Sequence, residues 1–288
     1  MPSAAPRGFP LMAVLSFHSA KGGVGKTTLT INVAVEFAFQ GIRTAVLDAD
    51  LNQHSTRFGE VFCAVHPELP LTFTGRVSAR NFTAELKAAE SSADIVIVDL
   101  PAGTGGMSFR AVMRSHLVII PAQRTVLDLR DAARTAAHIA DAEDYSNEAI
   151  YSALVWSRET NRFESRTERL VREGFLSMLA DPARAFLDAP LMESDAYRAG
   201  LVHAWVPREF AARSGTVAAR KVPGRQPESF FIPKGTANAA ENIAAVAGGI
   251  LERLKAIASG ANPGKVILRP EHLAQMRESV AAFDTEVA

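Results

Sequence analysis

A glycine-rich segment that joins an apolar run to a helical pattern constrains this chain more than any other feature. The segment spans Lys21–Thr28, reads KGGVGKTT, and follows the apolar run at 12–17. Its glycines let the backbone curl until successive N–H groups face one anion, and the N-terminus of the following helix adds partial positive charge. A strand, this loop and a helix in that order predict phosphate binding within an α/β fold.

The polar side chains of the loop predict a nucleoside triphosphate together with its metal ion. Lys26 is expected to reach the β- and γ-phosphates, and the Thr27 hydroxyl to bind Mg²⁺. The residues expected around the phosphates are Gly22, Gly23, Val24, Gly25, Lys26, Thr27 and Thr28. A dinucleotide-binding GxGxxG interpretation fails, because the glycine spacing is wrong and Lys26 would have no role. The remaining alternative is a glycine-rich turn at the edge of a sheet.

Short apolar runs alternate with longer helical patterns over most of the chain. Continuous apolar runs suit strands that are covered on both faces, as in parallel sheets. The expected strands lie at 12–17, 43–48, 71–74, 94–100, 116–122 and 149–156, and the expected helices at 27–40, 80–91, 127–144, 164–180, 239–258 and 271–283. Strand and helix in repeated succession predict a doubly wound, mostly parallel α/β sheet flanked by helices.

Three aspartates stand at the ends of two expected strands. Asp48 and Asp50 follow the second apolar run, and Asp99 ends the run at 94–100. Ligands of open α/β sheets bind at the carboxyl edge of the strands, so these side chains are expected near the phosphate loop. A phosphoryl-transfer site needs such carboxylates to hold Mg²⁺ and to orient water.

The loop departs from the common GxxxxGK form in two places. Ala20 stands where the first glycine is expected, and Lys21 precedes the glycine pair. This arrangement resembles the deviant Walker A motif, KGGxGK followed by Ser or Thr, of the ParA/MinD family of P-loop ATPases. The resemblance implies that Lys21 crosses a dimer interface and touches the phosphates of the partner's nucleotide. A cation supplied in this way would couple hydrolysis to dimerisation.

The same resemblance gives roles to the aspartates. It implies that Asp50 aligns the attacking water, that Asp48 lies close to the Mg²⁺ shell, and that Asp99 binds Mg²⁺ through water in a Walker B pattern. The segment PAGTGG at 101–106 resembles the second switch loop of the family, whose glycines let the backbone rearrange around a γ-phosphate. At 51–52, Leu-Asn replaces the Pro-Gln that is usual in the family.

The resemblance covers residues 12–204 and the helix near 240–258, including the segments 121–132 and 190–205. Adenine contacts in this fold usually come from loops after the later strands. The candidates at that place are Trp156, Ser157 and Arg158.

The composition and the positions of prolines and glycines predict how the 288 residues are organised. Residues 1–10, rich in proline, predict a flexible lead-in, and residues 11–260 a single ATPase domain. Prolines and glycines at 205–240 predict an irregular excursion of that domain. Residues 261–288 predict a C-terminal tail with a short helix that packs on its own domain or on a partner.

Cysteine and charge exclude several classes of function. Cys63 is the only cysteine, so one chain holds no internal disulfide, no CxxC metal site and no thiolate-bound iron–sulfur cluster. Acidic residues in the tail, such as Glu271 and Glu278, would be repelled by anionic lipid, so a membrane is not an expected partner. Without a signal-like or bilayer-spanning stretch, the expected location is the cytoplasm, with the nucleoid as the place of a DNA-bound form.

The expected excursion carries six basic against two acidic residues. The basic residues are Arg208, Arg213, Arg220, Lys221, Arg225 and Lys234. Such a patch is sufficient for nonspecific, salt-dependent DNA binding, although a solvated loop with surplus arginine has the same composition.

These expectations describe an ATPase of the ParA type that uses ATP and Mg²⁺. Its ATP-bound homodimer would bind DNA nonspecifically, and slow hydrolysis, stimulated by a partner or adaptor protein, would release it. The cargo would be a plasmid, a chromosome region or a protein complex. The alternatives are an ATP-dependent metabolic ligase of the dethiobiotin-synthetase type, a MinD-like surface-positioning ATPase, and an adaptor that binds nucleotide but barely hydrolyses it.

Overall fold

A parallel sheet forms the centre of the molecule. The computed structural model describes residues 12–160 and 162–287, with side chains through residue 278, so the expected lead-in at 1–10 lies outside the described residues. Within that range the sheet has seven strands in the order β3-β2-β4-β1-β5-β6-β7, and its registered pairs are all parallel. The strands are β1 Ala13–Phe17, β2 Thr44–Asp48, β3 Leu71–Thr74, β4 Ile95–Asp99, β5 Leu117–Ala122, β6 Tyr151–Glu159 and β7 Leu191–Met192.

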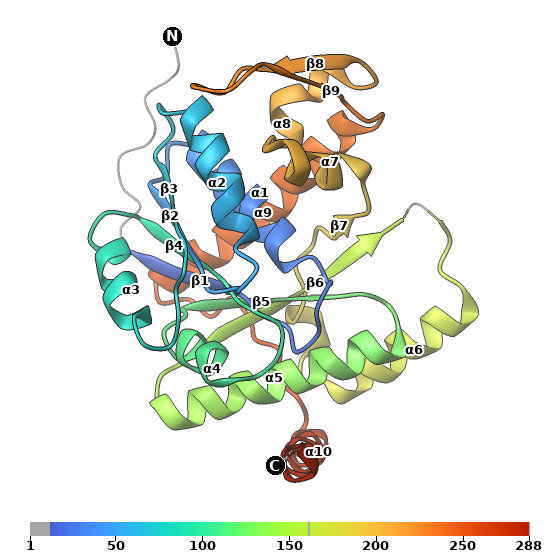
Figure 1. Cartoon of the computed structure of the whole chain (residues 1–288). Coiled ribbons are helices and arrows are strands. Elements are labelled where there is room, and N and C mark those ends of the chain that lie inside the picture. The colour runs from blue at the N-terminus through green and yellow to red at the C-terminus, as the bar shows by residue number, and fades with distance from the viewer. Residues whose placement is uncertain (1–11, 161, 288) are drawn as a thin grey trace.

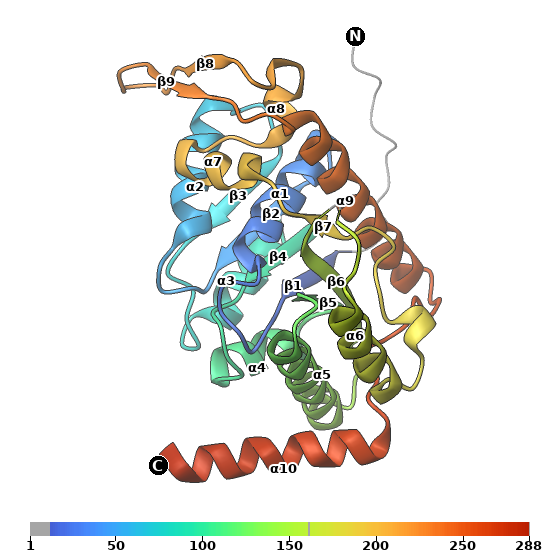
Figure 2. The same cartoon turned by 90° about the vertical axis from the view of Figure 1, so that its right-hand side faces the viewer.

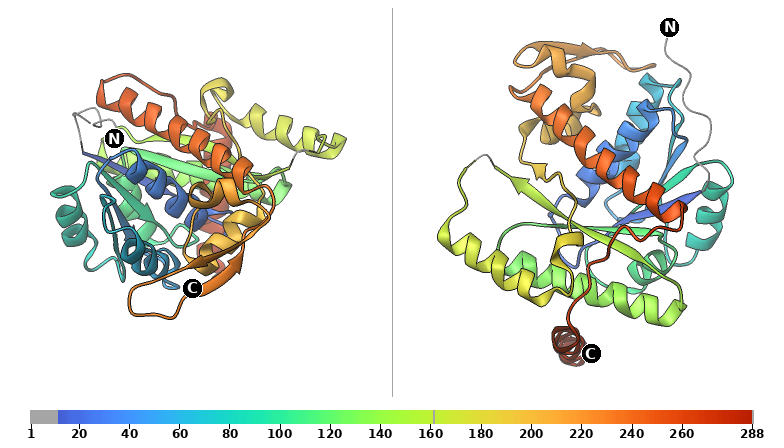
Figure 3. Two further views of the ribbon diagram at one scale, coloured as in Figure 1. Left: turned by 90° about the horizontal axis from the view of Figure 1, so that it is seen from above. Right: turned by 180° about the vertical axis from the view of Figure 1, so that it is seen from behind.

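Helices cover both faces of this sheet. The helices are α1 Lys26–Phe39, α2 His54–Val65, α3 Phe82–Glu90, α4 Gly106–Met113, α5 Val126–Ser146, α6 Arg166–Met178, α7 Asp195–His203, α8 Pro207–Phe210, α9 Thr236–Ala258 and α10 Pro270–Val287. Because successive strand residues point to opposite faces, Leu15 and Phe17 pack with α1, α2, α7 and α9, whereas Val14 packs toward α3 and α4. Figure 1 shows these layers, and Figure 3 shows α9 crossing its face beside α1. The doubly wound P-loop architecture is confirmed.

Two of the helices that were not expected, α2 and α4, begin where start signals are absent, whereas α7, also not expected, begins after a Ser194 cap. Helix α2 begins after Gln53, which adopts a left-handed φ of 54° and makes no side-chain cap, and its first turn has no acidic residue. Helix α4 begins at two glycines, Gly105 and Gly106, that a sequence pattern assigns to the preceding loop. Tertiary packing decides these starts, with Phe58 and Phe62 of α2 buried in the core.

The segment at 205–240 is more regular than its prolines and glycines predict. It contains α8, a 3₁₀ turn at Ala211–Arg213, and an antiparallel hairpin of β8 Val217–Arg220 and β9 Glu228–Phe231. Trp205 and Phe230 are buried and stack with ring centroids 5.9 Å apart. Pro223, Gly224 and Pro227 fall in the hairpin tip at 222–227, which Figures 1 and 2 show at the far end from α5, whereas Pro207 begins α8 and Gly235 precedes α9.

An ionic chain fixes the base of this hairpin to the end of α2. The carboxylate of Glu209 accepts from Arg220 of β8 and lies 2.8 Å from Nε2 of His66, which follows α2. The other oxygen of Glu209 accepts from the backbone N–H of Val206 at 2.9 Å, so Glu209 also caps α8. The hairpin is therefore anchored to the body on its buried side.

Helix α10 packs on its own domain through its first half. Leu273 and Met276 join the cluster formed by α5 and α6, and Arg277 pairs with Asp141 and Asp144 of α5. Figure 2 shows α10 lying across the end of the molecule below α5. Val280 and Phe283, the next apolar positions of α10, lie outside the described side chains. Among the described residues, no helix combines the length and the apolar character that a membrane span needs.

Candidate nucleotide-binding site

The glycine-rich loop has the backbone conformation that its sequence predicts. Gly23 and Gly25 adopt φ values of 76° and 99°, in the left-handed region that favours glycine. A Cβ on Gly23 would meet no atom within 4 Å, so the loop surface at that residue is open. Gly25 is the N-cap of α1, and the N-terminus of that helix therefore faces the loop.

Lys26 and Thr27 occupy the first turn of α1. The Lys26 ammonium donates to the backbone carbonyl of Lys21 at 3.1 Å and so spans the loop. Burial lowers the pKa of Lys26, while the charges of Asp99 and Asp50 act in the opposite direction. The Thr27 hydroxyl donates to Oδ1 of Asp99 at 3.3 Å. The structure thus joins the loop, α1 and the end of β4 in one polar cluster.

Asp99 is the buried carboxylate at the centre of this cluster. Thr30, which sequence analysis missed, also donates to Oδ1 at 3.3 Å, whereas Oδ2 is buried with no hydrogen-bond partner among the described residues. Burial, followed by the charge of Asp48, raises the pKa of Asp99 to about 7. A buried carboxylate oxygen without a donor suits a cation or a cation-bound water, so Asp99 and Thr27 fit a Mg²⁺ ion.

Asp48 lies beside Asp99 because the two residues are register partners of β2 and β4. Oδ2 of Asp48 accepts from the backbone N–H and the hydroxyl of Thr56, each at 2.9 Å. Oδ1 accepts from the backbone N–H of Asp50 at 3.1 Å. Both oxygens of Asp48 are therefore engaged, and they hold the loop after β2 against α2.

Asp50 lies in that loop and is half-buried. Its Oδ1 accepts from the backbone N–H of Asn52 at 2.8 Å and from the Asn52 amide at 3.0 Å. Asn52 replaces a residue of the usual family segment, yet it supports Asp50 directly. The carboxylate stays at the same sheet edge as Lys26, whose pKa its charge affects.

Lys21 is held by an aspartate that sequence analysis missed. Its ammonium lies 3.0 Å from Oδ2 of Asp128, and the two side chains are 36% and 2% exposed. Thr125 caps α5 by accepting from the backbone N–H of Asp128, and its hydroxyl donates to the same carboxylate. The spacing of Thr125 and Asp128 matches the first half of a capping box, which is the one local signal for this residue.

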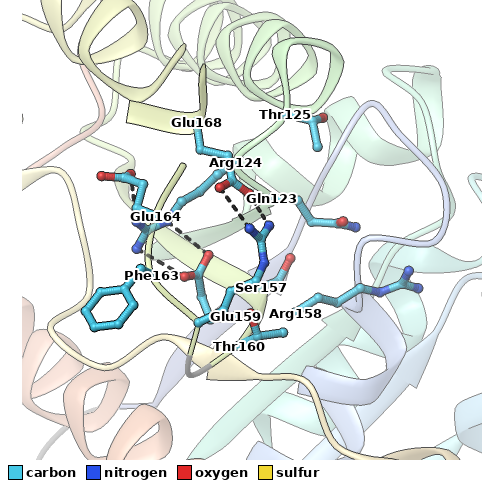
Figure 4. Close-up of a pocket in the computed structure, with 11 residues that line it drawn as sticks. Gln123, Arg124, Thr125, Ser157, Arg158, Glu159, Thr160, Phe163, Glu164 and Glu168 are labelled. Carbon is cyan, nitrogen blue, oxygen red and sulfur yellow. Dashed lines mark hydrogen bonds and ion pairs between the residues drawn. The ribbon is translucent and has the colours of Figure 1, made fainter. Parts of the chain in front are cut away.

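A polar cavity of about 290 Å³ adjoins the phosphate loop, and Figure 4 shows it between the ends of β5 and β6 and the start of α6. Arg158 connects the two by donating to the carbonyl of Gly23 at 2.8 Å. Of the adenine candidates, Ser157 and Arg158 line this cavity, whereas Trp156 stacks on Phe186 with ring centroids 5.0 Å apart. Trp156 is therefore a packing residue of the α5–α6 side.

The basic residues predicted for DNA contact divide into two groups. Arg208 pairs with Glu36 at 2.6 Å, and Arg220 is buried against Glu209. Arginine at 220 is thus removed from the exposed patch. The other four are exposed and form no ion pair within the described part of the chain: Arg213, Lys221, Arg225 and Lys234.

Known proteins resemble this chain in sequence and in fold. A family model described as VirC1 protein matches residues 12–204. Protein ParA of Rhizobium radiobacter is 29% identical over 191 residues, 65% of this chain and 82% of that protein. Protein virC1 of Rhizobium rhizogenes is 27% identical over 205 residues, covering 67% and 83%. The septum site-determining protein MinD of Pyrococcus horikoshii, solved with Mg-ADP, aligns with a TM-score of 0.58 at 16% identity, over 85% of this chain and 99% of that one.

The matched region begins at the strand before the phosphate loop and ends before the hairpin, as the sequence resemblance predicted. It contains Lys21, the phosphate loop and the three aspartates in the order that the fold requires. This chain therefore belongs to the VirC1 family, within the ParA/MinD type of P-loop ATPases.

Proposed function

We propose that this chain is an ATP-dependent dimerisation switch that positions or segregates a cargo such as a plasmid, a chromosome region or a protein complex. The observation that carries the proposal is the Lys21–Asp128 pair at the edge of the phosphate loop. A phosphate loop of the common GxxxxGK form does not require a second lysine at the position of Lys21. A lysine that is partly exposed and held by one ion pair is able to exchange that partner for another anion.

ATP would bind with its phosphates on the loop at Lys21–Thr28 and its base toward the cavity at Ser157 and Arg158. Lys26 would then exchange the carbonyl of Lys21 for the β- and γ-phosphates. Arg158 contacts the loop at Gly23 and would keep the nucleoside end in register with the phosphates.

Thr27 and Asp99 would hold Mg²⁺, with Asp48 fixing the adjoining loop. When bound, this ion neutralises charge on the phosphates. Asp50 would orient the attacking water, because its carboxylate is held by Asn52 at the sheet edge where the γ-phosphate would lie. Hydrolysis to ADP and phosphate then removes the group that the partner's Lys21 recognises.

Dimerisation in this proposal is an exchange of ionic partners. In one chain Asp128 neutralises Lys21; in the dimer Lys21 would contact the phosphates bound by the other chain, and Thr125 would remain on Asp128. Because Lys21 gives up one anion only as it gains another, the lysine stays paired, and the cost of the exchange falls on the buried Asp128, which keeps Thr125 as its donor.

DNA would be bound by the exposed cations of the hairpin region, Arg213, Lys221, Arg225 and Lys234. Two hairpins brought together by a dimer double the number of phosphate contacts, so nonspecific affinity would rise steeply on dimerisation. This makes DNA binding a property of the ATP state, and a partner protein that stimulates hydrolysis would end it.

The test is DNA retention of the purified protein with ATP, ADP or no nucleotide, across a salt series, together with sizing by light scattering. We expect a dimer that retains DNA only with ATP and loses it at high salt. Asp50→Ala should give a dimer that persists because hydrolysis stops. A monomer in all three states would refute the switch, and turnover that requires an added metabolite would identify a ligase instead.

A further inference from the structure

We propose that a groove between α5 and α6 docks an amphipathic helix of a partner protein whose apolar stripe is flanked by acidic residues. This inference rests on the proposed function, because it supplies the surface for the partner that stimulates hydrolysis. The α5–α6 groove has a volume of about 240 Å³ and is lined mainly by apolar residues. Its lining comprises Val126, Leu129, Arg130 and Ala133 of α5, Leu170, Val171, Gly174, Phe175 and Met178 of α6, and Met276 of α10.

The groove is flanked by large apolar side chains that face solvent. Val126, Leu127 and Leu170 are 63%, 66% and 60% exposed. Single exposed apolar residues are common, but several of them at one apolar groove favour an interaction site. Figure 1 shows α5 and α6 side by side, and two adjacent helices form the kind of furrow that accepts a third helix.

A glycine forms part of the floor of the groove. Gly174 lies in the middle of α6, and a Cβ built on it would meet no atom within 4 Å. Glycine is less favourable within a helix than every residue except proline. Neither a positive φ nor a close neighbour requires it at this position. Because Gly174 has no side chain, this part of the groove stays open and can accept a side chain of the partner helix.

The charges around the groove favour a partner helix with acidic residues on both sides of its apolar stripe. Arg130 lines the groove, and Arg166 lies one turn before Leu170 on α6. Within the described residues neither arginine forms an ion pair, whereas the neighbouring Arg124 and Arg172 are both paired with Glu164. Two cations without partners beside an apolar furrow complement carboxylates on either side of an apolar stripe.

The same charges exclude the chain's own N-terminal residues as the occupant. Residues 1–11 contain Arg7 and no acidic residue, and their three prolines oppose a helix. A separate protein is therefore the better match. Its helix would lie against the first turn of α5, where Asp128 holds Lys21, and so next to the group that the proposed switch must release.

The test uses a synthetic peptide as the probe, with leucine every three to four residues and glutamate on both flanks, and a second peptide with lysine in place of glutamate. Fluorescence anisotropy measures the affinity of each for the full chain. Gly174→Leu should weaken the glutamate peptide by about tenfold or more, because a side chain then fills the site of an anchor. Arg169→Leu is the matched control, since Arg169 is exposed on α6 but does not line the groove.

Charge reversal gives the decisive result. Arg130→Glu should weaken binding of the glutamate peptide and strengthen binding of the lysine peptide. A nonspecific apolar surface would not respond in this way. Equal binding of both peptides to all variants, or no binding to the unmodified chain, would overturn the proposal. Loss of the ATP dimer in Gly174→Leu would also overturn it, because the groove would then be a contact between two copies. Peptide binding is measured without nucleotide, so failure of the ATP switch would leave this result unaffected.

Discussion

The phosphate-binding edge and the β8–β9 hairpin both carry several charged side chains. Those at the edge have partners within the chain, whereas those near the hairpin tip are exposed. At the edge, Lys21 and Lys26 each have a partner within the chain, and Asp48 has three donors. At the hairpin, the cation at the base is buried and paired, while the cations near the tip are exposed. The lysines of the edge therefore already have partners within the chain, whereas the cations near the tip form no ion pair with the described residues.

The largest expected effect comes from two arginines of the hairpin. Arg220→Ala should lower the free energy of unfolding by about 3–5 kcal/mol, because it leaves Glu209 buried without its guanidinium. Arg225→Ala, at the exposed tip, should change it by less than about 0.5 kcal/mol. Urea unfolding measures both. Equal changes in the free energy of unfolding for the two variants would mean that the arginine at the hairpin base is no more important for stability than the one at the tip.

The next effect concerns the histidines beneath the phosphate loop. Burial, followed by the charges of His138 and Lys26, lowers the pKa of His18 to about 3, and its Nε2 lies 3.1 Å from Nδ1 of His138. The unfolded chain takes up this proton near pH 6.5 and the folded chain does not. Stability from His18 is therefore complete above pH 6.5 and is lost as pH falls toward 3, by about 1.4 kcal/mol per pH unit.

His18→Asn should flatten that part of the stability profile, measured by urea unfolding between pH 7 and pH 4.5. His54→Asn, which changes an exposed histidine, should leave the slope as it is. An unchanged slope in His18→Asn would show that other groups cause the acid instability.

A smaller effect separates the two members of the Lys21–Asp128 pair. Lys21→Ala leaves a buried carboxylate with only Thr125 as donor and should cost about 1–3 kcal/mol. Asp128→Asn leaves a partly exposed lysine that water solvates, so it should cost less than about 1 kcal/mol.

With ATP, Lys21→Ala should stay monomeric, whereas Asp128→Asn should still dimerise. Thermal unfolding and sizing report the two properties separately. If both variants remain monomeric, Lys21 acts through its contact with Asp128 and does not cross to a partner.

The smallest effect is on DNA. The double variant Lys221→Ala, Arg225→Ala removes two contacts from each chain of the dimer and should reduce the slope of log affinity against log salt by about 4, with no change in unfolding. Lys255→Ala on α9 is the control, since this exposed lysine is paired with Glu252. A slope that does not change would assign the DNA contact to another surface.

Local patterns predicted the parts of this molecule that local chemistry determines. The central strands are continuous apolar runs because both of their faces are covered, and Lys26, Thr27 and Asp99 belong to motifs that encode their own geometry. The start of α2 at His54 carries no signal, because Gln53 does not cap it. Asp128 lies 107 residues from Lys21, so only the packing of α5 against β5 and the phosphate loop brings them together.

Helix α2 connects the two charged regions of the molecule. At one end Thr56 grips the carboxylate of Asp48, and just past the other end His66 meets Glu209 and, through it, the hairpin. Its 12 residues span about 18 Å. The Asp48 carboxylate at the sheet edge and the base of the hairpin are therefore connected through a single helix.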